Sequence, residues 1–400
     1  MNCLRHLRTN FLTSMLALFP LRRLSLRTLT KPSRPLTATF LQRNFTRTTI
    51  RQVINPNTGQ EENMEAIKNT IAENMGGVAH ALARDDQKFD IEKDIPDQSG
   101  KVAVVTGGSE GIGYAGAFML LKNNIEKVFI VSPSQDVFNG CQNDIKEKLG
   151  ADKAQRAVWV KCDLGDIPSA VQAAKDISNG ADRLDILVLN AGRGIMTYQL
   201  TEGSQIDRHM MVNHVGHVAL TSHLLPLLKS TSEKGTVRIQ LQSSNAHEMA
   251  PKDTKFASID ELNQDLGPNG QYGRSKLANL LYARYLDRHL HKSNPNILAN
   301  ATHPGFVETK MSTQDIHEPY PTAGYGMSVA MAPIKKDQWE GATSLLYAAT
   351  KTDRSGEYIC PPAIVEPGSE LARNPELGES LMKLTREILK TKFNMEISDY

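Results

Sequence analysis

Short apolar runs rich in β-branched residues recur through the middle of the chain and predict buried strands. They cover residues 101–106, 128–131, 158–164, 184–189 and 236–241. Segments with apolar residues three and four positions apart, the spacing of one helix face, separate these runs. Alternating strands and helices of this kind predict right-handed βαβ units joined in a parallel sheet.

Polar or glycine-rich segments directly follow four of the predicted strands. They are residues 106–113 (T-G-G-S-E-G-I-G), Ser132, Asp163 and residues 190–192 (N-A-G). In an open sheet with helices on both faces, ligands bind outside the carboxyl ends of the strands. The sequence therefore predicts an α/β fold, a doubly wound parallel sheet of the Rossmann type in a single domain, with a ligand site at that edge.

The glycine-rich segment at 106–113 suits a phosphate group. Glycines allow a tight turn and a close approach of backbone to a pyrophosphate, and the helix that follows points N–H groups at the anion. The alternative is an ordinary strand-to-helix turn. The sequence favours NADP over NAD, because Ser132 stands where a carboxylate would repel a 2′-phosphate. Glu110 in the loop argues the other way, so NAD stays open.

A second group of residues suits proton transfer. Tyr272 and Lys276 are four positions apart on a helical pattern and share a face. A phenol with a pKa of about 10 exchanges its proton poorly at neutral pH unless a nearby cation stabilises the anion. The alternative is an ordinary helix surface. Ser243 and Ser244 end the last predicted strand and can bond a substrate oxygen, while Asn213, within an apolar helix, indicates either a satisfied kink or a water relay.

In their order, these motifs resemble those of the short-chain dehydrogenase/reductase family. Six motifs stand in the order found in the family, over roughly residues 98–365. They are T-G-x-x-x-G-x-G, N-A-G, the in-helix Asn, Ser-Ser, Y-x-x-x-K and P-G-F-V-E-T. S-S-x-A-H, Y-x-x-S-K-L-A-N and H-P-G are similar to the retinol-dehydrogenase-like branch. With its basic start, the whole chain is similar to mitochondrial oxidoreductases of filamentous fungi.

The resemblance implies a catalytic tetrad. Tyr272 would be the acid/base, and Ser244 would orient and polarise the substrate oxygen. Lys276 would hold the nicotinamide ribose and lower the pKa of the Tyr272 phenol, and Asn213 would support a relay water. The resemblance also implies cofactor contacts by Tyr272, Lys276, Thr106, Gly107, Ser109, Gly111, Ile112, Gly113, Asp163, Leu164, Asn190, Ala191, Gly192, Val307 and Thr309.

One departure from the family concerns the stretch between Ser244 and Tyr272, which is longer than usual. The additional residues, within 245–271, are polar and include several acids. We expect this insertion to form a loop near the site, where it could act as a lid and affect the size of the substrate.

The first residues have the composition of a mitochondrial transit peptide. Residues 1–51 hold nine Arg and one Lys of the chain's 46 basic residues but none of its 44 acidic residues, which leaves 36 basic residues against 44 acidic ones. An Arg-rich, hydroxyl-rich, acid-free start is typical of such presequences. We expect a transit peptide at 1–45, an extension and linker at 46–97 and the enzyme domain at 98–400. The acidic remainder argues against nucleic acid as a partner.

The remaining features of the sequence exclude fewer structures and functions. Four well-separated cysteines fit a reducing compartment, and no apolar run reaches the roughly 18 residues of a membrane span. We favour no metal site, since His209, His214 and His217 suit a core better than a zinc site. The pattern at 371–393 favours packing onto the domain, although a homo-oligomer seam and a membrane-surface helix stay open.

These expectations combine into one function. The sequence predicts an NAD(P)-dependent oxidoreductase that transfers a hydride to or from a CH–OH or C=O group of a small, apolar alcohol, aldehyde or ketone. The alternative is a catalytically silent nucleotide-binding sensor or scaffold of the same fold.

Overall fold

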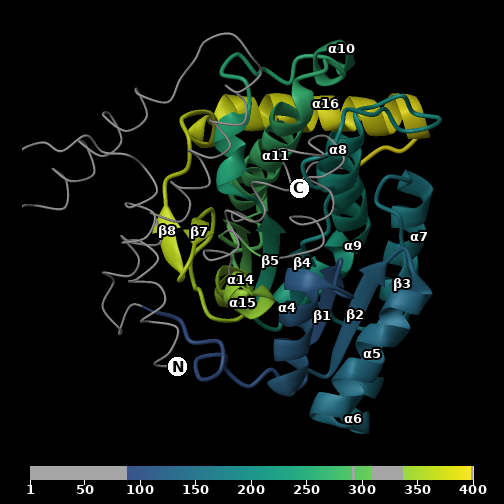
Figure 1. Ribbon diagram of the computed structural model, residues 1–400, viewed down its shortest axis with the longest axis vertical. Helices are drawn as coiled ribbons and strands as arrows, with labels where there is room; N and C mark the ends of the chain where they lie inside the picture. Colours follow the sequence, from purple (N-terminus) through teal and green to yellow (C-terminus); the bar gives the residue numbers. More distant parts are fainter. Residues whose placement is uncertain (1–87, 291–292, 306, 308–336, 398–399) are drawn as a thin grey trace, which may run out of the picture. The chain divides into compact units, whose positions relative to one another are not determined.

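The computed structural model describes residues 88–400 apart from 291–292, 306, 308–336 and 398–399. Its centre is an eight-stranded sheet in the order β3-β2-β1-β4-β5-β6-β7-β8 (Figure 1). Every neighbouring pair is parallel except β7 and β8. The strands are β1 (Val102–Thr106), β2 (Lys127–Ser132), β3 (Ala157–Lys161), β4 (Ile186–Leu189), β5 (Val237–Gln242), β6 (Ile297–Thr302), β7 (Tyr358–Cys360) and β8 (Ile364–Glu366).

Helices connect the strands and cover both faces of the sheet. The α-helices are α4 (Gly111–Lys122), α5 (Gln135–Leu149), α6 (Ala151–Gln155), α7 (Ile167–Asn179), α8 (Arg208–Met210), α9 (Gly216–Ser232), α10 (Ile259–Leu262), α11 (Gly267–Leu290), α14 (Gln338–Gly341), α15 (Thr343–Thr350) and α16 (Pro375–Phe393). A π-helical turn, η2 (Met211–Val215), precedes α9, and 3₁₀ turns lie at η3 (Asn245–Met249) and η6 (Leu371–Arg373). The predicted doubly wound fold is confirmed, and the antiparallel β8 is an addition at the sheet edge.

The apolar strands of the centre are explained by burial on both faces. Along β1, Val102 and Val104 belong to the core shared with α7, α9 and α11, whereas Ala103 and Val105 belong to the core shared with α4 and α15. The alternation follows from the two-residue period of a strand. Each face therefore needs apolar residues, which is why these strands read as continuous runs.

Helix α16 closes one of the two cores. Leu377, Leu381, Leu384 and Ile388 are buried in the same cluster as the apolar residues of α11. This packing confirms the preferred interpretation of the C-terminal pattern. None of the described helices combines the length and apolar character that crossing a bilayer requires.

Candidate active site

Thr106 joins two of the predicted motifs at the carboxyl edge of the sheet. Its side chain is fully buried, and its hydroxyl oxygen accepts hydrogen bonds from the backbone N–H groups of Asn190 (2.9 Å) and Ala191 (3.0 Å). The Asn190 side-chain amide donates back to the Thr106 carbonyl oxygen at 3.1 Å. The start of the glycine loop and the N-A-G segment therefore form one hydrogen-bonded unit.

The glycine loop has the geometry that a diphosphate seat requires. Gly107 and Gly111 adopt φ values of +64° and +57°, in the left-handed region that glycine occupies without strain. A Cβ atom on Gly113 would lie 2.3 Å from the Gly107 carbonyl oxygen and 2.5 Å from the side-chain nitrogen of Asn190. The loop therefore leads tightly into α4, whose first N–H groups are available to an anion, and these residues fit a dinucleotide.

Ser132, at the end of β2, stands where the sequence predicts the adenosine part of a bound dinucleotide. The Ser132 hydroxyl oxygen is buried and accepts hydrogen bonds from the Ser109 hydroxyl (2.9 Å) and the Trp159 indole N–H (3.2 Å). Lys161, the last residue of β3, is exposed and lies beside Ser132 in the strand register. The Asp163 carboxylate is exposed and accepts a hydrogen bond from the Gly165 N–H at 2.8 Å.

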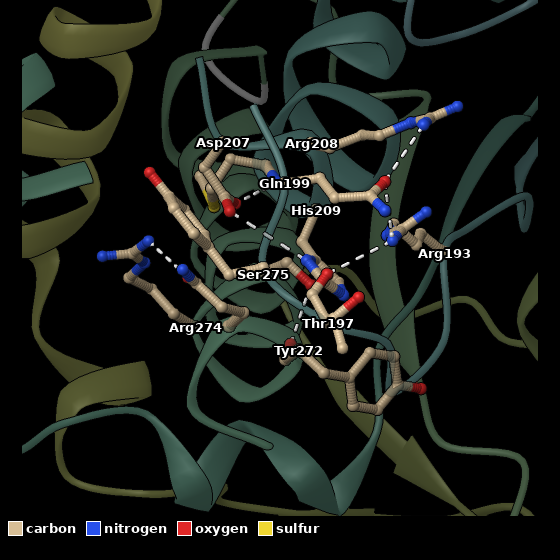
Figure 2. A network of polar contacts seen from close by, with 12 residues as sticks. Arg193, Thr197, Gln199, Asp207, Arg208, His209, Tyr272, Arg274 and Ser275 are labelled. Atoms are coloured by element: carbon tan, nitrogen blue, oxygen red, sulfur yellow. Dashed lines mark hydrogen bonds and ion pairs between the residues drawn. The ribbon is translucent and has the colours of Figure 1, made fainter. Parts of the chain in front are cut away.

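Helix α11 carries Tyr272 and Lys276 on one face, as their spacing predicts. The Lys276 side chain is 3% exposed, and its ammonium donates to the Gln242 carbonyl oxygen at 3.1 Å. This nitrogen lies 5.4 Å from the centre of the Tyr272 ring. Burial lowers the pKa of Lys276 to about 8. Figure 2 shows the Tyr272 phenol directed away from Arg274 and Asp207, on a different side of the helix.

Asn213 is the central residue of the π-helical turn η2, and its buried side chain is satisfied by protein groups. Its amide nitrogen donates to the Ser275 hydroxyl (2.8 Å) and the Arg193 carbonyl oxygen (3.1 Å), and its amide oxygen accepts from the Arg193 N–H (2.6 Å). Ser275 in turn donates to the Tyr272 carbonyl oxygen at 2.7 Å. Asn213 thus links the segment after N-A-G to the helix turn that carries Tyr272.

The two neighbouring serines have different tasks. The Ser243 hydroxyl donates to the Lys276 carbonyl oxygen at 2.8 Å and fixes the end of β5 to α11. The Ser244 hydroxyl oxygen accepts from the Ala246 N–H at 3.1 Å, which leaves its hydrogen for another acceptor. Ser244 is therefore the better placed of the two to bond a substrate oxygen.

Gly273 allows η3 to approach α11 beside Tyr272. A Cβ atom on Gly273 would lie 2.6 Å from the Ala246 carbonyl oxygen and 2.9 Å from the Ala250 nitrogen. Because η3 begins directly after Ser244, this contact brings Ser244 to the turn of α11 that carries Tyr272. Gly273 was not among the predicted site residues, although an isolated glycine within a helical pattern indicates close packing at that position.

The insertion at 245–271 is packed against the domain in this structure. Arg274, which is 2% exposed, donates to the carbonyl oxygens of Glu261 (3.0 Å) and Leu262 (2.5 Å). The Asn263 side chain accepts from the Asp207 N–H at 2.9 Å and donates to the Gln205 carbonyl oxygen at 2.7 Å. The insertion is thus attached both to α11 and to the segment before α8, and its action as a lid stays a prediction.

Asp207 is a buried carboxylate that sequence reasoning missed. One of its oxygens accepts from the Met210 N–H at 2.8 Å and caps α8, and burial raises its pKa to about 6. The other oxygen lies 4.0 Å from the Nδ1 atom of His209, whose Nε2 atom faces the Gly194 carbonyl oxygen at 3.0 Å. Figure 2 shows this pair within a network that also holds Arg193 and Gln199.

The remaining histidines contact protein oxygens. His214 is fully buried, with Nε2 3.0 Å from the Thr385 hydroxyl, and His217 contacts Asn213 and Thr106. These contacts agree with the interpretation of all three histidines as core residues. The position of His217, four residues after Asn213 on a helix, is the signal that predicts contact with the Asn213 carbonyl oxygen.

The predicted carboxamide-side contacts are described only in part. Val307 is buried, and Gly341 at the end of α14 makes room for its side chain. Thr309 lies outside the described residues. Among the predicted site residues that the structure describes, Thr106 ends β1, while Asn190 and Ser244 come soon after β4 and β5. Asp163 and Leu164 come after β3, and Val307 comes after β6.

Comparisons with known proteins show what the chain is similar to. A family model described as short chain dehydrogenase matches residues 101–258, a stretch that includes Ser244 and ends before Tyr272. The Neurospora crassa protein named "Putative oxidoreductase bli-4, mitochondrial" is 50% identical over 365 residues, which cover 90% of this chain and 87% of that protein. A Danio rerio protein named polyprenol dehydrogenase is 29% identical over 270 residues, which cover 66% of this chain and 78% of that protein.

A solved structure shows the same fold. The complex of Pseudomonas aeruginosa RhlG with NADP superposes with a TM-score of 0.50 at 24% identity, over 66% of this chain and 95% of that one. At this identity the likeness concerns the fold alone. A Colletotrichum higginsianum protein named short chain dehydrogenase/reductase dpchH is 31% identical over 319 residues, which cover 74% of this chain and 76% of that protein. Together with the family-model match, this relative establishes that the chain belongs to the short-chain dehydrogenase/reductase family of oxidoreductases.

Proposed function

We propose that this oxidoreductase transfers a hydride between a nicotinamide dinucleotide and a CH–OH or C=O group of a small, apolar alcohol, aldehyde or ketone. One observation carries the proposal. The structural elements that bear Ser244, Tyr272 and Lys276 are bonded together at the sheet edge where the glycine loop opens. A binding protein without turnover does not need a buried ammonium beside a phenol.

The chain's own residues supply proton transfer and orientation. The Tyr272 hydroxyl gives a proton to the substrate oxygen during reduction and takes one during oxidation. The Lys276 ammonium favours the phenolate by its charge, and the Ser244 hydroxyl donates a hydrogen bond to the same substrate oxygen. When bound, the dinucleotide supplies or accepts the hydride.

An apolar substrate is supported by two observations on relatives and motifs. The S-S-x-A-H and Y-x-x-S-K-L-A-N segments are similar to the retinol-dehydrogenase-like branch, and the printed name of the Danio rerio relative specifies a polyprenol. Retinol and polyprenols are both apolar alcohols. The panel for the first assay therefore contains retinoids and aliphatic aldehydes, ketones and alcohols.

The decisive experiment compares the wild type with Tyr272→Phe on this panel, with NADPH and with NADH. We expect measurable turnover by the wild type and a loss of about 100-fold or more in the variant, because the proton donor is gone while the ring remains. The matched control is Tyr347→Phe in α15, on the opposite face of the sheet, which should retain full activity. Tight dinucleotide binding without any turnover would support the sensor or scaffold instead.

We further propose that NADP is the preferred dinucleotide. The end of β2 carries no carboxylate, and the exposed ammonium of Lys161 lies beside Ser132. Alternating residues of a strand share a face, so Lys161 lies on the same side of the sheet as Trp159, whose indole bonds Ser132. A cation there favours a 2′-phosphate.

A titration of both cofactors tests this preference. We expect Lys161→Ala to weaken NADPH binding about fivefold and to leave NADH binding unchanged, since only NADPH presents the additional charge. Lys175→Ala, an exposed lysine of α7, serves as the control and should change neither affinity. Equal affinity of the wild type for the two dinucleotides would contradict the proposal.

We also propose that the protein is mitochondrial and that residues 1–45 are its transit peptide, followed by an extension at 46–97 and the enzyme domain at 98–400. The acid-free, Arg-rich composition of the first residues supports this, as does the word mitochondrial in the name of the Neurospora crassa relative.

A further inference from the structure

The imidazole ring of His217 lies between the two halves of the candidate site. The residue is 1% exposed and belongs to α9. Its Nδ1 atom lies 3.0 Å from the carbonyl oxygen of Asn213, and its Nε2 atom lies 3.0 Å from the hydroxyl oxygen of Thr106. One ring therefore contacts both the helix turn of the tetrad Asn and the first residue of the glycine loop.

The two partners determine where the ring proton is. A carbonyl oxygen only accepts hydrogen bonds, so Nδ1 of His217 must carry the hydrogen. Burial and the nearby Lys276 ammonium lower the pKa of His217 to about 4, so the ring is neutral near pH 7. Its Nε2 atom then has a lone pair, which accepts the hydrogen of the Thr106 hydroxyl.

This arrangement orders the Thr106 hydroxyl completely. Its hydrogen is directed to His217, while its oxygen accepts the N–H groups of Asn190 and Ala191. The competing acceptor, the Val188 carbonyl oxygen, is more distant at 3.3 Å. His217 therefore acts on the N-A-G segment through a hydroxyl that it orients.

The other end of the ring fixes the backbone of Asn213. The Asn213 side chain is already held by Arg193 and Ser275, so the bond to His217 adds restraint at the main chain of the same residue. π-Helical turns occur frequently at functional sites, and Nδ1 of His217 contacts a carbonyl oxygen within this one.

We propose that His217 is a positioning residue that clamps the dinucleotide loop at Thr106 to the catalytic helix turn at Asn213. The clamp holds the two halves of the site at a fixed separation. A bound dinucleotide therefore keeps its position relative to the tetrad. The inference deepens the proposed function and rests on it for the effect on turnover, but its effect on dinucleotide binding does not require turnover.

The test compares two substitutions of the same residue. His217→Phe keeps a flat ring and removes both hydrogen bonds, and we expect NADPH affinity and kcat each to fall about tenfold. His217→Gln restores one donor and one acceptor on a single amide group, and we expect both quantities within about threefold of the wild type. Affinity is measured by the fluorescence of bound NADPH, and kcat with the best substrate of the panel.

The control is His214→Phe, which removes a buried histidine that faces Thr385 on α16 instead of the site. We expect this variant to lower Tm while NADPH affinity and kcat stay unchanged. A purely structural role for His217 would give the same pattern in His217→Phe and would overturn the proposal. If His217→Phe does not fold, the near-native affinity expected of His217→Gln still decides the matter.

Nitrogen NMR of the wild type provides a readout that does not depend on activity. We expect the ring signal that is lost in His217→Gln to be neutral and protonated on Nδ1, and to stay so when the pH is lowered from about 8 to about 5.5. A proton on Nε2 would overturn the clamp. Absence of turnover with an intact Nδ1 signal and normal NADPH binding would reject the proposed function and leave the clamp standing.

Discussion

Lys276 is a buried lysine, and burial disfavours the charged form of its side chain. Burial lowers its pKa to about 8, so its ammonium is lost as the pH rises through this value. We predict that kcat/KM for the dinucleotide, which reports groups of the free enzyme, falls as the pH rises through about 8. Lys276→Arg should move this fall to higher pH, because a guanidinium keeps its proton above about pH 12, even though its larger head lowers the rate at neutral pH.

The control for this experiment is the unsubstituted enzyme in buffers of different chemistry at constant ionic strength. An inflection that stays near pH 8 in Lys276→Arg would assign the titration to another group. The direct check is the full pH profile from about pH 6 to about pH 10, because a single pH would not separate lost charge from altered geometry.

Asp207 is a buried acid, and burial favours its protonated form. Its carboxyl group therefore keeps a proton to a higher pH than an exposed Asp does. Its pKa is raised to about 6, whereas an unfolded Asp has a pKa of about 3.9. The contribution of this proton to stability is complete below about pH 4 and is lost as the pH rises through about 6. We predict that Asp207→Asn removes this dependence and is more stable than the wild type by about 1–3 kcal/mol above pH 7.

Urea denaturation at several pH values measures this difference. Asp253→Asn changes an exposed acid of the insertion and should keep the pH dependence of the wild type. The idea fails if Asp207→Asn and the wild type differ by the same free energy at pH 5 and at pH 8.

The residues of the proposed tetrad could be named from the sequence, because Tyr272 and Lys276 share a helix face by their spacing and the motifs around Asn213 and Ser244 resemble those of the family. Arg274 and Asp207 could not, because charged side chains are exposed by default and these two are buried. His217 was visible as a core histidine, but its contact with Thr106 joins residues 111 positions apart and depends on the sheet order.

Among the structural elements, the strands that are buried on both faces of the sheet were the easiest to predict from the sequence. The strands β1 to β4 consist mostly of apolar residues, β5 alternates apolar residues with Arg238, Gln240 and Gln242, and all five were predicted to within a few residues. The strands β6 to β8 were not predicted, and β7 and β8 have only three residues each. Their positions depend on pairing with neighbours, which periodicity does not reveal.

The contact between η3 and α11 at Gly273 gives a prediction about elements. Gly273→Ala would place a methyl group 2.6 Å from the Ala246 carbonyl oxygen, so η3 and the adjoining Ser244 must move away from Tyr272. We expect kcat to fall about tenfold and the free energy of unfolding to fall by about 1–3 kcal/mol, which is usual for overpacking. Steady-state kinetics and urea denaturation measure the two effects.

Gly140→Ala in α5 is the matched control. A Cβ atom there meets no atom within 4 Å, and alanine favours a helix interior more than glycine does. This variant should be fully active and more stable by about 0.5–1 kcal/mol. Full activity of Gly273→Ala would show that the position of Ser244 does not depend on this contact.

For the whole molecule, the sheet order explains how distant motifs become one site. Thr106 ends β1, Asn190 follows β4, and Ser244 lies two residues after β5; these three strands are adjacent in the sheet, so their carboxyl ends lie side by side. Motif order predicted this edge, since parallel strands present their carboxyl ends together. The attachment of the 245–271 insertion was not predictable, because its hydrogen bonds join residues from separate parts of the chain.

The uneven distribution of charge gives the last prediction, which concerns the whole chain in the cell. All ten basic residues of 1–51 lie in an acid-free stretch, and a negative-inside potential draws such a stretch inward. We predict that the native protein from mitochondria begins after about residue 35, and that exchanging Arg22, Arg23 and Arg27 for Gln leaves full-length protein outside. Fractionation and N-terminal mass spectrometry measure both outcomes.

Exchanging three exposed lysines of the domain, Lys175, Lys234 and Lys252, for Gln should leave import unchanged, because only charge in the presequence responds to the potential. Mitochondrial protein that still begins at Met1 would show that residues 1–45 are retained.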